Sequence, residues 1–171
     1  MLDVKVESLR VVIVDDEPLA REGLRSQLAE ISGIEVIAEA SNGYDACDQI
    51  IAHRPDIVFL DIAMPELDGF ATLERLEPED VPPAVVFVTA YDAHAVRAFS
   101  ARALDYILKP VAPERLAAAV EHAVQRVREA RALRDSIERE GPRSCLHAPD
   151  SASFSIAFPR PIDRSGPPLP H

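Results

Sequence analysis

The chain has 171 residues, of which 47% are hydrophobic, so it is long enough for one packed domain with an appendage. Its 29 acidic residues outnumber the 18 basic ones and give a net charge of −11 at pH 7. This charge argues against direct binding to nucleic acid and favours protein partners and divalent cations. The sequence has no run near the roughly 20 apolar residues of a membrane span, no signal-peptide pattern and no metal-ligand spacing around its two cysteines, so we expect a cytoplasmic protein with no membrane contact.

The order of apolar and amphipathic segments predicts strands and helices that alternate along the chain. Continuous β-branched or aromatic runs such as VVIV, DIVFL and AVVFV are typical of strands covered on both faces. Strands are expected at 10–15, 34–39, 56–60, 84–89 and 104–108. Helices are expected from Pro18, with Leu24, Leu28 and Ile31 along one stripe, and then at 43–53, 69–77, 92–101 and 113–139.

This alternation predicts the α/β class. Repeated strand–helix–strand units imply a doubly wound parallel sheet of five strands with helices on both faces. The flavodoxin-like order 2-1-3-4-5 is the expected topology. Such sheets place functional groups beyond the carboxyl ends of the strands, near the switch point of the strand order.

Polar side chains follow four of the five predicted strands. Asp15 and Asp16 follow the first strand, Asp61 follows the third, and Thr89 and Lys109 end the fourth and fifth. In the expected order the first and third strands are neighbours, so the three carboxylates should converge, and a hard cation such as Mg²⁺ would offset their repulsion. Each residue alone could equally be a helix cap, a turn former or a surface lysine. Their common position is what predicts a site.

Four segments carry these residues: VVIVDDEP, DIVFLDIAMPELDG, VVFVTAYD and ALDYILKP. Together they resemble the receiver domain of two-component response regulators, and the resemblance covers about residues 9–125. The longer segment TAYDAHAVRAFSARALDYILKPV is similar to receivers that precede a LytTR-type (LytR/AlgR-like) DNA-binding domain. The resemblance implies a phosphorylation-controlled signalling switch rather than an enzyme, with a histidine kinase or a phosphotransfer protein as its partner.

The resemblance also implies a role for each residue at the expected site. Asp61 would accept the phosphoryl group, either from a kinase or from a small phosphodonor. Asp16 and Asp61, assisted by Asp15 and by the backbone carbonyl of Ala63, would hold Mg²⁺. Lys109 would contact a phosphoryl oxygen as a compact cation.

Two further residues form the switch that the resemblance implies. Thr89 would bond the new phosphoryl group, and Tyr106 would then turn inward, so that the face made by the fourth helix, the fifth strand and the last helix rearranges. That face would control a partner or form a homodimer. Ala63 and Tyr91 would tune hydrolysis, and a small residue opposite an aromatic one predicts slow to moderate loss of the phosphoryl group. A cis peptide bond is expected after Lys109.

The chain is expected to fall into four segments: an N-terminal extension at 1–8, a receiver at 9–127, a helical extension or linker at 128–140, and a proline-rich tail at 141–171. The spacing of apolar residues in the extension is compatible with a solvated linker, which we favour, or with a dimerising helix. The tail holds seven of the 15 prolines and is expected to be disordered. It does not resemble a LytTR output domain, which leaves a single-domain regulator, a truncated sequence and an altered reading frame as explanations.

Two rival functions come from other classes. A Mg²⁺-dependent phosphatase of the haloacid dehalogenase type also uses a strand-end aspartate and a lysine. Its second acid follows the nucleophile by two residues, where this chain has Ala63, so we do not favour it. The other rival is a DNA-binding transcription regulator. The LytTR resemblance supports that ancestry, but these residues are not expected to contact DNA directly.

Overall fold

The computed structural model of this chain describes residues 7–92 and 103–141. Contacts between Cα atoms group the chain into two units, Met1–Arg139 and Glu140–His171, and all five strands lie in the first. The helix predicted at 92–101 lies outside the described residues, apart from Asp92, and so does the tail beyond Gly141. The four segment boundaries therefore stay predictions.

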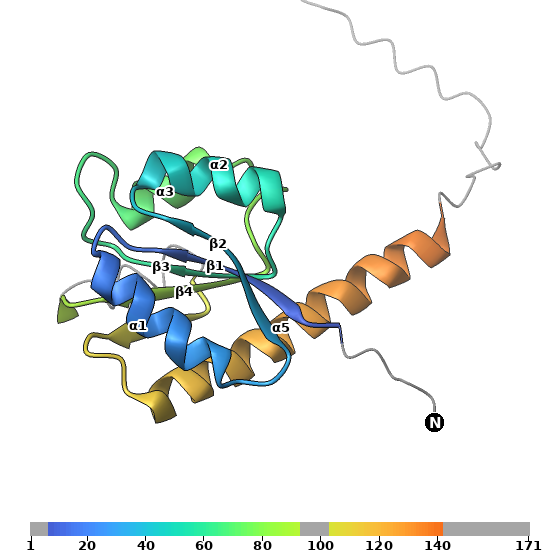
Figure 1. The fold of residues 1–171 in the computed structure, drawn as a ribbon. Coiled ribbons are helices and arrows are strands. Elements are labelled where there is room, and N and C mark those ends of the chain that lie inside the picture. The colour runs from blue at the N-terminus through green and yellow to red at the C-terminus, as the bar shows by residue number, and fades with distance from the viewer. Residues whose placement is uncertain (1–6, 93–102, 142–171) are drawn as a thin grey trace, which may run out of the picture. The chain divides into compact units, whose positions relative to one another are not determined.

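The described residues form five strands and four helices that alternate as predicted. The strands are β1 (Leu9–Val14), β2 (Ile34–Ala40), β3 (Ile57–Leu60), β4 (Ala84–Thr89) and β5 (Asp105–Leu108). The helices are α1 (Pro18–Ala29), α2 (Gly43–His53), α3 (Gly69–Arg75) and α5 (Pro113–Glu140), as labelled in Figure 1. Each strand begins and ends within one residue of its predicted position.

Two helices end two residues before the predicted positions: α1 stops at Ala29, so Ile31 of the predicted stripe lies beyond it, and α3 stops at Arg75 rather than at residue 77. The C-cap residue of α3, Leu76, has an extended backbone with ψ of 139°. Pro78 follows closely, and the residue before a proline is disfavoured in the helical region. The proline thus disfavours a helical conformation at Glu77, the predicted last residue, and the extended backbone of Leu76 ends the helix just before it.

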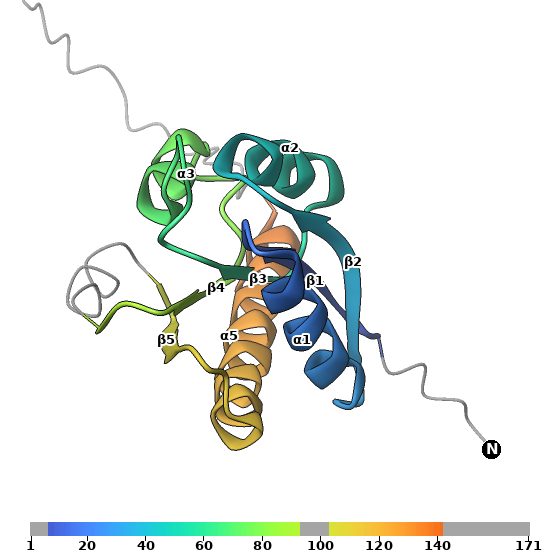
Figure 2. The ribbon, with the colours of Figure 1, turned by 60° about the vertical axis from the view of Figure 1, so that its left-hand side comes forward.

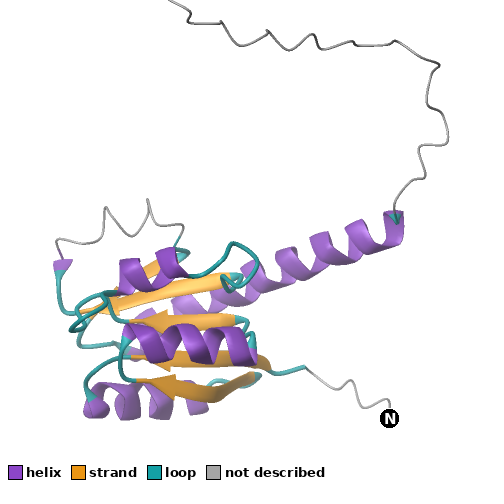
Figure 3. Cartoon of the chain, turned by 90° about the horizontal axis from the view of Figure 1, so that it is seen from above, coloured by secondary structure: helices purple, strands orange, loops and turns teal. Residues whose placement is uncertain are grey.

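All strand pairs are parallel, and the sheet has the order β2-β1-β3-β4-β5, which confirms the predicted fold class. Figure 3 shows the strands pointing the same way, with helices on both sides. Backbone hydrogen bonds continue the ladder past the strand ends: the amide of Asp15 donates to Ala40, that of Asp61 to Val14, and that of Lys109 to Thr89. These bonds bring the residues that follow β1, β3 and β5 to one edge of the sheet.

Two apolar layers cover the sheet because successive strand residues point to opposite faces. On one face, Val11, Ile13 and Phe59 pack with buried residues of α1 and α5. On the other face, Val12 and Leu60 pack with buried residues of α2 and α3. Figure 2 shows α2 and α3 above the sheet, with α1 and α5 below it. The burial of both faces explains why the strand sequences are continuously apolar.

The last helix, α5, continues well beyond its buried portion. Its last buried residue is Val127. Further along, Arg131 forms ion pairs with Asp56 at 2.9 Å and with Glu7 at 3.2 Å. Leu133 and Ile137 are 64% and 65% exposed. The extended last helix is thus confirmed, whereas the preference for a solvated linker over a dimerising helix stays a prediction.

Candidate functional site

Three carboxylates meet at the carboxyl ends of β1 and β3. Asp15 and Asp61 are buried, with 5% and 3% of their surface exposed, and Asp16 is half-buried. One oxygen atom from each of the three lies within 4.8 Å of the others. Carboxylate oxygens at this spacing are the donors that a hard divalent cation prefers. The predicted convergence of the three acids is therefore present in the structure.

Lys109 reaches the same cluster from the end of β5. Its Nζ atom lies 2.6 Å from Oδ2 of Asp15 and 3.2 Å from Oδ2 of Asp61. The lysine side chain is 18% exposed, so solvent screens these contacts only weakly. The peptide bond between Lys109 and Pro110 is cis, as predicted. The ammonium group thus partly offsets the repulsion among the acids.

The pKa values of the two central groups reflect this arrangement. Burial raises the pKa of Asp61; the Lys109 ammonium opposes that rise and the Asp15 carboxylate adds to it. Burial alone would lower the pKa of Lys109, but the hydrogen bond to Asp15 and the charges of Asp61 and Asp15 raise it above its ordinary value. Lys109 is accordingly a firmly charged cation beside a carboxyl group that is costly to ionise.

Local backbone geometry orients the two buried acids. The amide of Glu17 donates to Oδ1 of Asp15 at 2.9 Å, and the amide of Ala63 donates to Oδ1 of Asp61 at 3.1 Å. Gly69 lies against the same turn, where an added Cβ would be 2.5 Å from the carbonyl oxygen of Asp61. A residue without a side chain is therefore needed there for α3 to begin next to Asp61.

Thr89 and Tyr106, the predicted switch residues, lie on β4 and β5 near the site. Thr89 is fully buried, and its Oγ1 accepts a hydrogen bond of 3.4 Å from the amide of Tyr91. The hydroxyl of Tyr106 donates to the carbonyl oxygen of Tyr91. Burial raises the pKa of Tyr106, and the charge of Asp92 raises it further. Thr89 and Tyr106 are thus linked through the backbone of one residue, Tyr91.

The two residues predicted to tune hydrolysis both face solvent. Ala63 is exposed beside Asp61, and the side chain of Tyr91 is 57% exposed. Both lie at the edge of the sheet that carries the acids. Their positions are compatible with control of water access, but their roles stay predictions.

Arg21 in α1 is a site neighbour that the motifs do not identify. Its Nη1 atom donates to the backbone carbonyl of Asp15 at 2.6 Å, and its Nε atom donates to Glu39 at 3.3 Å. The only available signal is its position six residues after Asp15, on the first turns of a helix that begins at the site. That spacing does not reveal a contact with a backbone oxygen.

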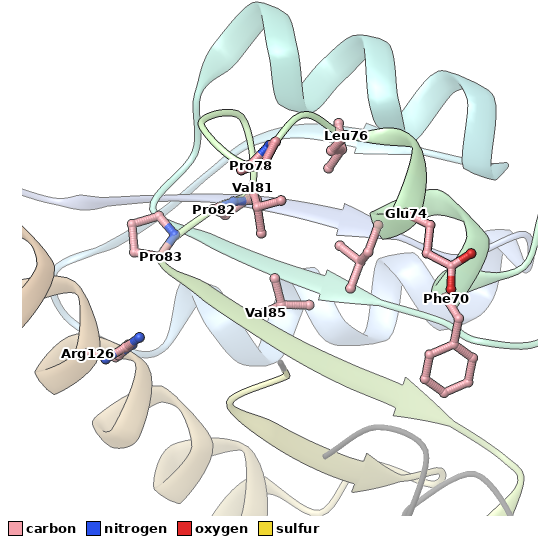
Figure 4. A pocket seen from close by; sticks show the side chains of 10 residues that line it. Phe70, Glu74, Leu76, Pro78, Val81, Pro82, Pro83, Val85 and Arg126 are labelled. Atoms are coloured by element: carbon pink, nitrogen blue, oxygen red, sulfur yellow. The ribbon is translucent and has the colours of Figure 1, made fainter. Parts of the chain in front are cut away.

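A hollow formed by described residues lies away from the acids. Figure 4 shows it between α3, the segment that leads into β4, and Arg126 of α5. It measures about 530 Å³ and is lined mainly by apolar and proline side chains. A cavity of about 180 Å³ adjoins the site itself, where Asp15 and Lys109 face α1 and Val111. The chemistry of the strand ends, rather than cavity size, therefore locates the candidate site.

The sheet order and the acid cluster with its lysine define a flavodoxin-like α/β protein with a polar site at the switch point of the sheet. Residues 11–121 match the response regulator receiver domain family, and the chain belongs to that family. The match favours the receiver interpretation over the phosphatase alternative.

Named relatives extend this result. An uncharacterized response regulatory protein of Yersinia pestis is 53% identical over 109 residues, which are 64% of this chain and 45% of that protein. The transcriptional regulatory protein BtsR of Escherichia coli is 44% identical over 127 residues, which are 74% of this chain and 51% of that protein. The chain thus spans about half the length of the curated relatives that it matches.

Solved structures with the same fold cover nearly the whole of their own chains. The response regulatory domain of mrkE from Klebsiella pneumoniae is 31% identical with a TM-score of 0.63, over 71% of this chain and 99% of that one. The REC domain of AraT from Geobacillus stearothermophilus is 30% identical with a TM-score of 0.61, over 74% and 98% of the two chains. In the described part of this chain, no helix is long and apolar enough to cross a bilayer.

Proposed function

We propose that this chain is a phosphorylation-controlled switch that accepts a phosphoryl group on Asp61 in a Mg²⁺-dependent reaction. The observation that carries the proposal is the position of Asp61, which is 3% exposed, within 4.8 Å of the oxygens of Asp15 and Asp16 and 3.2 Å from the Lys109 ammonium. The Asp61 carboxylate therefore has the Lys109 ammonium beside it and two further carboxylates that could hold a metal cation. Membership of the receiver family supports the same role.

The donor set fits Mg²⁺. The carboxylates of Asp15, Asp16 and Asp61 and the backbone carbonyl of Ala63 would hold the ion, since hard oxygen donors suit it. Bound Mg²⁺ would supply neutralisation of the charge on the phosphoryl oxygens.

The transfer itself requires little beyond positioning. A carboxylate oxygen of Asp61 attacks the phosphorus of a phosphohistidine, a P–O bond forms, and the P–N bond breaks with its electron pair passing to the imidazole. The amide of Ala63 holds Oδ1 of the carboxylate at 3.1 Å. Lys109 would turn from the Asp61 carboxylate toward a phosphoryl oxygen, because the phosphoryl group carries more negative charge than a carboxylate.

Thr89 and Tyr106 would carry the change outward. The Thr89 hydroxyl accepts from the amide of Tyr91, whose carbonyl accepts from Tyr106, so a Thr89 hydroxyl drawn to the phosphoryl group would shift this linked set. Phosphorylation would then bias an existing equilibrium between two arrangements of the surface around β5. Ala63 and Tyr91 would set the access of water, and with it the lifetime of the phosphoryl group.

The partners proposed here are a histidine kinase or a phosphotransfer protein in the cytoplasm, and a second copy that uses the face containing β5 and α5. BtsR is named a transcriptional regulatory protein, and its resemblance to this chain favours control of transcription as the output. We propose that the receiver belongs to the LytTR-type subgroup, in which the output is a DNA-binding domain. The described residues would serve as the switch and not as the DNA-binding surface.

Intact-mass spectrometry after incubation with Mg²⁺ and acetyl phosphate or phosphoramidate tests the proposal. Wild type should gain one phosphoryl mass that EDTA prevents, and Asp61→Asn should gain none. Asp68→Asn is the matched control, because Asp68 lies in the same loop and caps α3, a role that asparagine also performs. A phosphoryl adduct on Asp61→Asn, or no adduct and no Mg²⁺ binding in wild type, would contradict the assignment.

A further inference from the structure

We propose that Arg21 positions the peptide between Asp15 and Asp16, and that this positioning sets the affinity of the acidic cluster for Mg²⁺. The inference rests on the proposed Mg²⁺ site. It assigns a function to a residue outside the strand-end cluster. Arg21 would touch neither the ion nor the phosphoryl group and would act through the backbone.

The contact is short and partly protected from solvent. Nη1 of Arg21 donates to the carbonyl oxygen of Asp15 at 2.6 Å, and the arginine side chain is 18% exposed. Hydrogen bonds from a charged donor are shorter and stronger than those between neutral groups. This one spans the turn that joins β1 to α1, which is the turn that carries the two adjacent acids.

The Arg21 hydrogen bond completes the set of contacts around Asp15. The Asp15 amide donates to the carbonyl of Ala40 at 3.1 Å, Oδ1 accepts from the amide of Glu17 at 2.9 Å, and Oδ2 lies 2.6 Å from Lys109. With the carbonyl held by Arg21, every polar atom of Asp15 has a fixed partner.

The carbonyl of Asp15 belongs to the peptide plane that it shares with Asp16. The orientation of that plane sets the direction in which the Asp16 carboxylate leaves the backbone. Asp16 is half-buried and follows the strand, so the ladder hydrogen bonds of β1 do not hold it. Arg21 therefore fixes the one acid of the cluster that the sheet does not.

Arg21 is itself held in place from β2. Its Nε atom donates to Oε2 of Glu39 at 3.3 Å. Arg25 forms a second ion pair with the other oxygen of Glu39, at 3.1 Å and without hydrogen-bond geometry, and its side chain is 59% exposed. Arg25 thus shares the anchor of Arg21, but only Arg21 has a hydrogen bond to the Asp15 carbonyl among the contacts of the described residues.

Electrostatics alone would give the opposite effect on Mg²⁺. Removal of a positive charge near the cluster should strengthen the binding of a cation. A loss of affinity in an Arg21 variant therefore has to come from geometry. Outer-shell partners of metal ligands typically change affinity by about 10–100-fold when they are removed, so we expect Arg21→Ala to bind Mg²⁺ about tenfold more weakly.

Calorimetric titration of the full chain with Mg²⁺ tests this inference on four variants. Arg21→Ala should show the tenfold loss, and Arg21→Lys should be intermediate, because lysine keeps the charge but cannot bridge Asp15 and Glu39 with a planar fork. Arg25→Ala removes a similar charge from the same anchor and should stay within about twofold of wild type. Glu39→Gln should weaken binding slightly, because the neutral amide holds Arg21 less firmly.

The dependence of phosphorylation on Mg²⁺ separates positioning from a general loss of structure. With acetyl phosphate, Arg21→Ala should need about tenfold more Mg²⁺ for its half-maximal rate and should reach nearly the wild-type rate at saturation. A merely structural defect would lower the saturating rate as well.

Wild-type affinity in Arg21→Ala, or equal losses in Arg21→Ala and Arg25→Ala, would overturn the inference. If Arg21→Ala does not fold, unchanged affinity in Arg21→Lys would overturn it instead. Absence of Mg²⁺ binding by folded wild type would refute the proposed function, so the two failures are distinguishable.

Discussion

Replacement of Lys109 by methionine should strongly destabilise the protein when Mg²⁺ is removed. The Nζ atom lies 2.6 Å from Asp15 and 3.2 Å from Asp61, and at an effective dielectric constant of about 20 these contacts are worth about 6 and 5 kcal/mol before desolvation. Burial of the ammonium offsets much of this. Removal of one partner of a buried ion pair typically costs about 3–5 kcal/mol because the other charge is left unpaired. We expect a loss of about 3 kcal/mol near neutral pH, at the low end because Asp61 can take up a proton.

The loss should depend on pH in a defined direction. The pKa of Asp61 is already raised by burial, and it should rise further in Lys109→Met. When the folded pKa of a carboxyl group lies above its unfolded pKa, the protein is destabilised progressively as pH rises from the unfolded value to the folded value, and this penalty disappears below the unfolded value. The difference between wild type and Lys109→Met should therefore shrink as pH falls from neutrality toward the ordinary carboxyl pKa of about 4.

Urea denaturation in EDTA, followed by far-ultraviolet circular dichroism, measures both effects. Arg128→Met is a suitable control, because it removes a cation from an exposed position of α5. Mg²⁺ should also bind Lys109→Met more tightly than wild type, because the ammonium and the ion compete for the same oxygens. A free energy of unfolding within about 0.5 kcal/mol of wild type at neutral pH in EDTA would refute the reasoning.

Three further substitutions test other parts of the structure. Burial alone would raise the pKa of Asp105, but the hydrogen bonds from Arg115 lower it below its ordinary value. Because the Arg115 side chain is 41% exposed, Asp105→Asn should cost only about 1 kcal/mol of stability near neutral pH. In urea denaturation this difference should vanish as pH falls through the lowered pKa. Gly69→Ala should cost about 2 kcal/mol, because its Cβ would lie 2.5 Å from the Asp61 carbonyl oxygen, and wild-type stability in the same assay would contradict the turn geometry. Thr89→Ala should still gain a phosphoryl mass but should lose the phosphorylation-dependent shifts of amide resonances in β5; shifts equal to those of wild type would remove Thr89 from the switch.

The fold could be predicted because its main determinants are local. Strands with two covered faces are continuously apolar, and such strands separated by amphipathic helices leave few topologies. The three acids and Lys109 could be placed together for the same reason, because parallel strands end at one edge and each residue directly follows a strand. Strand ends were accordingly predicted to within one residue, whereas α3 ended early where a proline followed.

The supporting contacts of the site could not be predicted in this way. Arg21 meets Glu39 across 18 positions and meets Asp15 through a backbone atom, which has no signature in the sequence. The link from Tyr106 to Tyr91 likewise depends on how closely β5 lies to the segment that follows β4. Such contacts depend on the packed structure, and apolar periodicity carries no information about them.

Lys109 and Arg21 both place positive charge near the same acids, but they bind different atoms. This difference distinguishes two explanations of Mg²⁺ affinity, one based on net charge alone and one that also requires a fixed backbone geometry. Lys109 binds the carboxylate oxygens that a cation would use, so its removal should tighten Mg²⁺ binding. Arg21 binds a backbone carbonyl and leaves the carboxylates free, so its removal should weaken Mg²⁺ binding although it also deletes one positive charge. A site governed only by net charge would respond to both substitutions in the same direction. Opposite responses would follow only if the orientation of the Asp15–Asp16 peptide, and not charge alone, determines how the acids hold the ion.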